Sequence, residues 1–495
     1  MLKQIEQDIC LAIQSKYPLN YIISWEEDRV IKSLEKIAIH LNKKLRIWSL
    51  TDSDQSISLS LGINPYSKFY SFLDNICTKS ENSIFLLKDV HSLLKDPVIL
   101  RKIRDIANTI STTSKSLIFL SPVLEVPEEI KKDLVLFDYP LPNIQDIKEI
   151  YDSLVKASEN NTKFKIELND KQEEELLSAA VGLTEVEIEN VLSKAVILNN
   201  SLSEKDVGLI LEEKKQIIKK SGYLEYYDLK DTINDVGGME NLKEWLRKRA
   251  KAFSKEARDF GLPEPKGILL LGVQGCGKSL TAKAVASSWR LPLLRFDIGV
   301  IFGKYVGESE ENIRKVIKIS ESIAPCILWI DEIEKGFSGL GGDSDSGVTK
   351  RVLGTVLTWM QEKEKPVFIV ATSNDITKLP PELIMKGRFD EIFFVDLPND
   401  KEREEIFKIH LLKRRKDLIF DLTELIQLSD GFSGAEIEEV IESSLFDAFE
   451  NNHDLQLADI IKNLKETVPL SKTMKEKIDE LRKWAVNRAV FASKQ

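Results

Sequence analysis

A stretch in the second half of the chain has the residue types and spacing of a phosphate-binding loop. It matches the pattern G-x-x-x-x-G-K-[ST] and consists of Gly272, Val273, Gln274, Gly275, Cys276, Gly277, Lys278 and Ser279. Its glycines let successive backbone N–H groups point at one centre, where phosphate oxygens can sit. Lys278 adds a positive charge beside the β- and γ-phosphates, and the Ser279 hydroxyl is a ligand for Mg²⁺. An apolar run precedes the loop and a helical pattern starts at Leu280, which is the context that this motif requires, so a chance match to the pattern is a poor explanation. We therefore predict a site for ATP and Mg²⁺ that includes Leu280.

Two carboxylates follow an apolar run some fifty residues further along the chain. Asp331 and Glu332 come directly after residues 326–330, which read Cys-Ile-Leu-Trp-Ile. We expect Asp331 to hold Mg²⁺ through water and Glu332 to orient and deprotonate an attacking water. A solvated turn after a buried strand is the alternative reading. With the phosphate loop upstream, the pair favours hydrolysis of ATP over binding alone.

Two further polar residues stand where they could act on the γ-phosphate. Asn374 ends an apolar run that begins at Val367, and its amide could bridge the phosphate and the water; an Asn that satisfies a turn is the alternative. Arg388 precedes the last apolar run. An arginine at a subunit edge can reach a neighbour's γ-phosphate, whereas a surface ion pair is the equally ordinary reading.

The elements that must position these residues follow an alternating pattern. Short apolar runs at 268–271, 294–297, 327–330, 367–370 and 392–395 predict five strands, and helical patterns such as 311–324 and 348–361 lie between them. This alternation is typical of a parallel sheet with crossover helices. The first half repeats the plan with runs at 21–24, 45–48, 84–87, 117–120 and 134–137. Residues 182–189 also resemble residues 431–438. This similarity favours an internal duplication; the alternative is that any two α/β domains share this alternation of strands and helices.

We place the domain boundaries where this pattern changes. The predicted parts are an α/β domain at 1–140, a helical segment at 141–220, a linker at 221–235, a second α/β domain at 236–398 and a helical lid with C-terminal helices at 399–495. The linker assignment rests on a mixture of Gly, Tyr and Asp that breaks the helical pattern.

The motifs of residues 235–446, in this order, resemble the AAA clade of the AAA+ ATPases. The resemblance includes the entry at 235–238, the phosphate loop, the acidic pair, the strand that ends at Asn374 and the segment 387–390. It implies an α/β fold of tandem AAA+-like P-loop domains, in which each parallel sheet is flanked by helices and followed by a helical lid. It further implies that adenine is flanked by Val236, Gly237, His410, Gly434 and Ala435. By the same likeness Asn374 senses the γ-phosphate and Arg388 is an arginine finger that acts across subunits, so a homo-hexameric ring is expected.

Tyr305, Val306 and Gly307 resemble the pore loop of this family, an aromatic residue followed by an aliphatic one and a glycine. Six such loops would line a central channel, where the flat face of Tyr305 could grip an extended polypeptide. A tyrosine packed at a corner between strand and helix is the alternative.

The chain also departs from the family pattern. Met385 stands where a second arginine is usual, so hydrolysis could be slower or depend more on assembly. Residues 24–29 of the first half read Ser-Trp-Glu-Glu-Asp-Arg, which puts three acids where phosphate needs N–H groups and a lysine. We therefore expect a degenerate AAA-like domain there that serves assembly or recognition; an unrelated α/β adaptor is the alternative.

Composition limits the partners. The chain has 495 residues with a formal net charge of −10, which argues against non-specific binding to the phosphates of nucleic acid. No apolar run is long enough for a membrane span, and the N-terminal residues lack the apolar core of a signal peptide. Four scattered cysteines predict neither a zinc cluster nor a disulfide framework.

The layout of a degenerate N-terminal copy and one intact module resembles AAA proteins encoded in algal plastid genomes and in cyanobacteria. This likeness implies the chloroplast stroma, or otherwise a cyanobacterial cytoplasm, as the place of action. The leading interpretation is an ATPase that remodels or translocates an unknown protein substrate as a ring. The alternative is a nucleotide-controlled switch or scaffold with low turnover.

Overall fold

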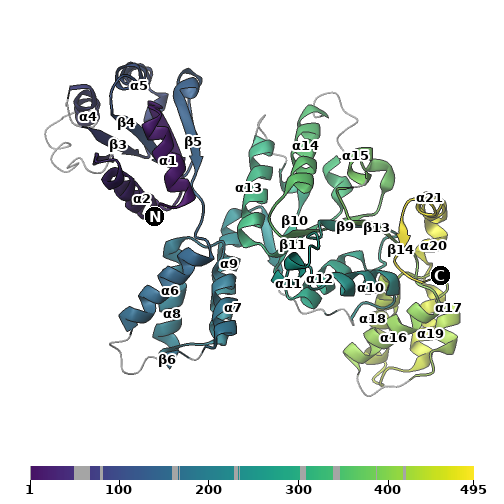
Figure 1. Ribbon diagram of the computed structural model, residues 1–495. Helices are drawn as coiled ribbons and strands as arrows, with labels where there is room; N and C mark the ends of the chain where they lie inside the picture. Colours follow the sequence, from purple (N-terminus) through teal and green to yellow (C-terminus); the bar gives the residue numbers. More distant parts are fainter. Residues whose placement is uncertain are drawn as a thin grey trace. The chain divides into compact units, whose positions relative to one another are not determined.

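The computed structural model describes residues 2–49, 67–78, 82–158, 165–166, 168–227, 232, 235–301, 308–337, 346–385, 387–415 and 420–494 (Figure 1). Within these residues the chain forms two compact units, Met1–Ile210 and Leu211–Gln495. The division falls inside one helix, α9 (Val207–Ser221), ahead of the predicted linker at 221–235.

The first unit contains a parallel five-stranded sheet in the order β2-β3-β4-β1-β5. Its strands are β1 (Leu19–Ile23), β2 (Lys44–Trp48), β3 (Ser83–Lys88), β4 (Ser116–Ser121) and β5 (Leu134–Asp138). Helices cover both faces: α1 (Gln4–Gln14) and α2 (Glu27–His40) pack on one, α4 (Ser67–Thr78) and α5 (Pro97–Ile110) on the other. The central strands are therefore buried along most of their length, which is why they read as continuous apolar runs.

A helical part completes the first unit. It consists of α6 (Ile144–Ser158), α7 (Asp170–Ala180) and α8 (Glu185–Asn199), with a short strand pair formed by β6 (Lys165–Ile166) and β7 (Ser201–Leu202). The start of α8 is fixed by a capping box, in which Thr184 accepts from the amide of Glu187 and the Glu187 carboxylate accepts from the amide of Thr184.

The second unit contains a seven-stranded sheet in the order β14-β13-β9-β12-β11-β10-β8. Its strands are β8 (Leu224–Tyr227), β9 (Gly267–Gly272), β10 (Leu293–Phe296), β11 (Cys326–Ile330), β12 (Val367–Ser373), β13 (Glu391–Val395) and β14 (Val490–Phe491). On one face lie α10 (Glu240–Arg249) and α12 (Lys278–Trp289), and on the other α13 (Glu308–Ile323) and α14 (Ser346–Glu362), while α21 (Lys475–Ala485) contributes side chains to both core clusters. Short helices α11 (Lys255–Asp259) and α15 (Pro381–Ile384) connect strands.

A helical lid follows this sheet. It comprises α16 (Asp400–Arg414), α17 (Thr423–Leu428), α18 (Gly434–Glu450) and α19 (Leu457–Glu466), which share one apolar core, and α20 (Leu470–Thr473) leads to α21. The α18 start repeats the capping box of α8, with Ser433 and Glu436 as the reciprocal pair.

The predicted fold class is confirmed: both sheets have the central strand order of a parallel α/β fold, and the ends of the ten predicted strands lie within three residues of the expected positions. Two strands differ from the sequence-based boundaries. The predicted linker contains β8, which pairs antiparallel with β10, and the predicted all-helical C-terminal part ends in β14, which pairs with β13. Both are short edge strands, so neither has the long apolar run of a central strand. None of the helices in the described part of the chain combines the length and apolar composition that a membrane crossing requires.

Candidate functional site

A cavity of about 450 Å³ lies in the second unit where the carboxyl ends of its central parallel strands meet the lid. The wall on the sheet side comes from the loop after β9 and from the residues that end β11 and β12; the lid side comes from α16 and the first turns of α18. Ligands in open parallel sheets bind at this edge, so the cavity is the candidate functional site. The predicted residues that line it are Val236, Gly237, Gln274, Gly275, Cys276, Gly277, Lys278, Ser279, Leu280, Asp331, Glu332, Asn374, His410, Gly434 and Ala435.

The phosphate loop has its shape because two glycines allow close backbone approach. A Cβ on Gly272 would lie 1.9 Å from the carbonyl oxygen of Val395, and Gly275 adopts a φ of 77°, where a Cβ would lie 2.9 Å from the Ser433 hydroxyl. A side chain at either position would displace β13 or the lid. The loop then leads directly into α12, whose first residue is Lys278, so free N–H groups at the helix start lie beside the cavity.

Lys278 is almost fully buried at the start of α12. Its Nζ donates to the carbonyl oxygens of Gly272 at 3.0 Å and Val273 at 2.7 Å, within the loop itself. Burial lowers the pKa of Lys278 to about 8, well below the ordinary value for lysine. An anion in the cavity would favour the charged ammonium and could draw it from these carbonyls.

Asp331 is hydrogen-bonded to residues from two other elements. Its Oδ1 accepts from the Ser279 hydroxyl at 3.2 Å and from the Thr372 hydroxyl at 2.7 Å. The two residues predicted to ligate Mg²⁺ are therefore in direct contact, one at the start of α12 and one at the end of β11. Hydroxyl and carboxylate oxygens are ligands that Mg²⁺ prefers.

Glu332 has a strained backbone and well-defined partners. Its φ of 48° lies in the left-handed region, and its amide donates to the Thr372 hydroxyl at 2.9 Å. The carboxylate accepts from the side-chain amide of Asn374 at 3.0 Å and also pairs with Lys335. Asn374 and Thr372, both from the end of β12, thus hold the predicted base from two sides.

The lid contributes the far wall of the cavity. The amide of Ala435, in the first turn of α18, donates to the carbonyl oxygen of Gly275 at 3.0 Å. His410 lies on α16 beside Glu438, with 3.3 Å between its Nδ1 and a carboxylate oxygen. Burial lowers the pKa of His410, so its imidazole is uncharged at neutral pH. Val236, Gly237, His410 and Ala435 line this part of the cavity together with the carboxylates of Glu402 and Glu438.

Some predicted site residues lie elsewhere. Gly272 and Val273 stand behind the cavity wall and contribute carbonyl groups to Lys278. Arg388 does not line the cavity of its own chain, and its buried Nη1 has no hydrogen-bond partner among the described residues. Met385 is 62% exposed. The predicted pore-loop residues Tyr305, Val306 and Gly307 lie outside the described residues.

Several residues at the site were missed by sequence reasoning. Thr372 joins Asp331 to Glu332, and Glu334 accepts from the amide of Asn374 at 2.9 Å. Thr372 stands two residues before Asn374, so the strand period places both on one side, a signal that could have identified it. The cavity is also lined by Met239 and Glu402, whose amide–carboxylate hydrogen bond joins positions far apart in the sequence. No local pattern marks that pair.

Comparison with protein families gives matches along most of the chain. The family described as "ATPase family associated with various cellular activities (AAA)" matches residues 268–397. The N-terminal domain and the second domain of SpoVK-like AAA ATPases match residues 5–139 and 145–221. The phosphate loop and both acids lie within the first of these matches.

Individual relatives extend over the whole chain. An AAA domain-containing protein ycf46 of Pyropia yezoensis is 43% identical over 486 residues, which cover 97% of both chains. The ycf46 protein of Guillardia theta is 40% identical over 97% of this chain and 94% of its own. A cell division cycle protein 48 homolog of Archaeoglobus fulgidus is 34% identical over 52% of this chain and 36% of its own length. The whole-chain resemblance expected from the sequence is thereby confirmed.

The hydrogen bonds of Thr372 predict a measurable effect on stability. Thr372→Val keeps the shape of the side chain but leaves the Glu332 amide and an Asp331 oxygen without this partner. We expect the free energy of unfolding of the second unit to fall by about 1–3 kcal/mol, measured by urea denaturation. Thr377→Val is the matched control, because the Thr377 hydroxyl bonds Asp375 at the exposed surface. Equal effects of the two substitutions would contradict a special role for Thr372.

Proposed function

The chain belongs to the family of AAA domain-containing ycf46 proteins, and from this premise we propose that its second unit binds ATP with Mg²⁺ and hydrolyses ATP to ADP and phosphate. The observation that carries the proposal is that Lys278 and Ser279, at the start of α12, and Asp331 and Glu332, at the end of β11, line one cavity. This set supplies a cation, two oxygen ligands and a base, which are the groups that phosphoryl transfer to water requires.

Each group has a role that follows from its surroundings. Backbone N–H groups of the loop and the Lys278 ammonium bind the phosphates, while adenine lies toward Val236, Gly237, His410, Gly434 and Ala435. Ser279 and Asp331 would hold Mg²⁺, which would neutralise charge on the phosphates. Glu332, held by Asn374, orients the attacking water and removes its proton. Asn374 contacts this carboxylate, and the family likeness supports a further role for its amide as the sensor of the γ-phosphate.

The substitution Glu332→Gln tests hydrolysis. The amide cannot accept a proton, so we expect ATP turnover to fall by about 10²-fold or more while ATP binding remains. Steady-state phosphate release and equilibrium nucleotide binding measure the two quantities, with exposed Glu382→Gln on α15 as the control. Wild-type turnover in the Glu332→Gln variant would contradict this mechanism. ATP binding by the wild type without turnover would support a nucleotide-controlled switch or scaffold instead.

The lowered pKa of Lys278 predicts how ATP binding depends on pH. Below pH 8 the free protein carries a charged lysine, and affinity should change little. Above pH 8 the neutral lysine must take up a proton on binding, so the Kd for ATP should rise by up to about tenfold per pH unit. Titration calorimetry between pH 7 and 9.5 measures this, and Lys278→Met should remove the dependence. A Kd that stays constant across this range in the wild type would contradict the role of Lys278.

We extend the proposal to assembly. Arg388 does not line the cavity of its own chain, which supports a role in a neighbour's cavity within a ring, most simply a homo-hexamer. In such a ring Met385 leaves Arg388 without the usual second arginine. The ring would remodel or translocate a protein substrate, with Tyr305, Val306 and Gly307 at its pore. The family likeness further supports the chloroplast stroma, or a cyanobacterial cytoplasm, as its location, and the net charge of −10 disfavours nucleic acid as its ligand.

Tyr305 tests the remodelling proposal separately from hydrolysis. We expect Tyr305→Ala to abolish stimulation of ATP turnover by casein, an unfolded model substrate, while basal turnover persists. Tyr305→Phe should retain stimulation because it keeps the aromatic face. The same stimulation in Tyr305→Ala as in the wild type would contradict the pore-loop role.

A further inference from the structure

The first unit has the same central strand order as the second but a different segment at the position of the phosphate loop. In both sheets the first strand of the unit's parallel core lies between the fourth and fifth, so β1 corresponds to β9. Residues 273–277 separate β9 from α12, whereas only residues 24–26 separate β1 from α2. This shorter connection has no glycine and ends in a carboxylate, Glu26.

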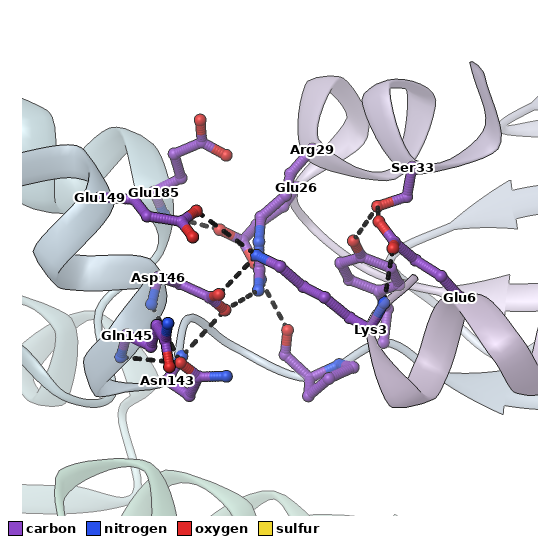
Figure 2. Close-up of polar contacts among 12 residues, drawn as sticks. Lys3, Glu6, Glu26, Arg29, Ser33, Asn143, Gln145, Asp146, Glu149 and Glu185 are labelled. Atoms are coloured by element: carbon purple, nitrogen blue, oxygen red, sulfur yellow. Dashed lines mark hydrogen bonds and ion pairs between the residues drawn. The ribbon is translucent and has the colours of Figure 1, made fainter. Parts of the chain in front are cut away.

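Glu26 links the α/β part of the first unit to its helical part. Its Oε1 accepts from the backbone amide of Glu185, the first residue of α8, at 2.6 Å, and its Oε2 accepts from Arg29 Nη1 at 2.7 Å (Figure 2). The Glu26 side chain is only 4% exposed. A carboxylate at the start of a helix is favoured by the free N–H groups there, so Glu26 acts as a fixed anion for α8.

In the second unit, the contact between the helical lid and the sheet part at the corresponding place is made by different groups. There the first turn of α18 contacts the loop after β9 through the Ala435 amide and the carbonyl oxygen of Gly275. Both α8 and α18 begin with a Ser/Thr and Glu capping box, so the two helices are equivalent in local sequence as well as in position. The contact in the second unit is thus between two backbone groups, whereas the contact in the first unit involves the side-chain carboxylate of Glu26.

A second set of contacts joins the same two parts. Arg29 Nη2 donates to Asp146 Oδ2 on α6 at 2.9 Å, and Arg29 Nη1 also donates to the carbonyl oxygen of Pro140. Lys3 Nζ donates to Asp146 Oδ1 at 2.5 Å (Figure 2). Lys3, Glu26 and Arg29 belong to the α/β part, and Asp146 and Glu185 belong to the helical part. Glu26, Arg29 and Asp146 are largely buried and paired, whereas the Lys3 side chain is 39% exposed, so loss of one of the three buried partners would leave another uncompensated.

We propose that Glu26, Arg29, Asp146 and Lys3 form an internal lock that holds the helical part of the first unit on its α/β part without nucleotide. The Glu26 carboxylate already accepts hydrogen bonds from the first amide of α8 and from Arg29. These are the donors that an anionic ligand at this place would need. Its charge also disfavours a phosphate at the same position. The first unit is then a body of constant shape while ATP acts on the second unit.

Hydrogen–deuterium exchange on the full chain tests the lock. We expect the amides at the start of α8 and α6 to be protected in the wild type, with no change when Mg²⁺ and saturating ATP are added to the Glu332→Gln background. In Glu26→Ala these amides should exchange at least about tenfold faster, and ATP should not restore protection. Asp146→Asn provides a milder variant in case Glu26→Ala does not fold, and Glu149→Gln is the control, because Glu149 is 65% exposed and lies 3.8 Å from Lys3.

The outcomes separate this proposal from the proposed ATPase activity. Protection of α6 or α8 that increases with ATP in the Glu332→Gln background would overturn the lock, as would wild-type protection in both Glu26→Ala and Asp146→Asn. If ATP alters exchange nowhere, including residues 272–279, ATP binding is contradicted, while the comparison of variants still decides the lock.

Discussion

The hydrogen bonds that Asp331 shares with Ser279 and Thr372 depend on the order of three strands, and most of the second unit serves to fix that order. Ser279 follows β9, Asp331 follows β11, and Thr372 lies on β12, which stands between them. The three groups meet only if all three strands are parallel and end at the same level. The register pairs Ile330 with Ala371 and Ser373 with Leu271, which aligns these ends. A shift of one residue would turn Thr372 to the other face of the sheet.

The same edge of the sheet concentrates groups that are unfavourable in isolation. A buried lysine, Lys278, and a glutamate in the left-handed region, Glu332, both line the cavity, beside a loop that requires glycine at close approaches. The apolar layers on both faces of the sheet, with strands β9, β11 and β12 fully buried, stabilise the arrangement. Such features tend to gather at functional sites, because surrounding structure must hold them in place. The buried core of the sheet therefore stabilises the strained conformations at its edge.

Sequence reasoning succeeded where the information is local. Strands with continuous apolar runs and the phosphate loop with its flanking elements could be located from neighbouring residues alone, and the order of motifs identified the family. It failed for the edge strands β8 and β14, whose pairing depends on partners far along the chain. Contacts such as the Met239 amide with Glu402, or Arg29 with Asp146, join residues more than a hundred positions apart. Nothing in either local sequence specifies the partner.

The two units show how one topology can close a helical part over a sheet in two ways. In the second unit the lid touches the loop by a backbone hydrogen bond beside a cavity, so a ligand that fills the cavity can change the free energy of closure. In the first unit the corresponding helix meets a buried side-chain carboxylate that is part of the chain. A covalently attached anion is always present, so its effect does not vary with ligand concentration. Glu26 therefore stands where the second unit has its glycine-containing loop, and the contact with the helical part at this place is made by a carboxylate of the chain itself.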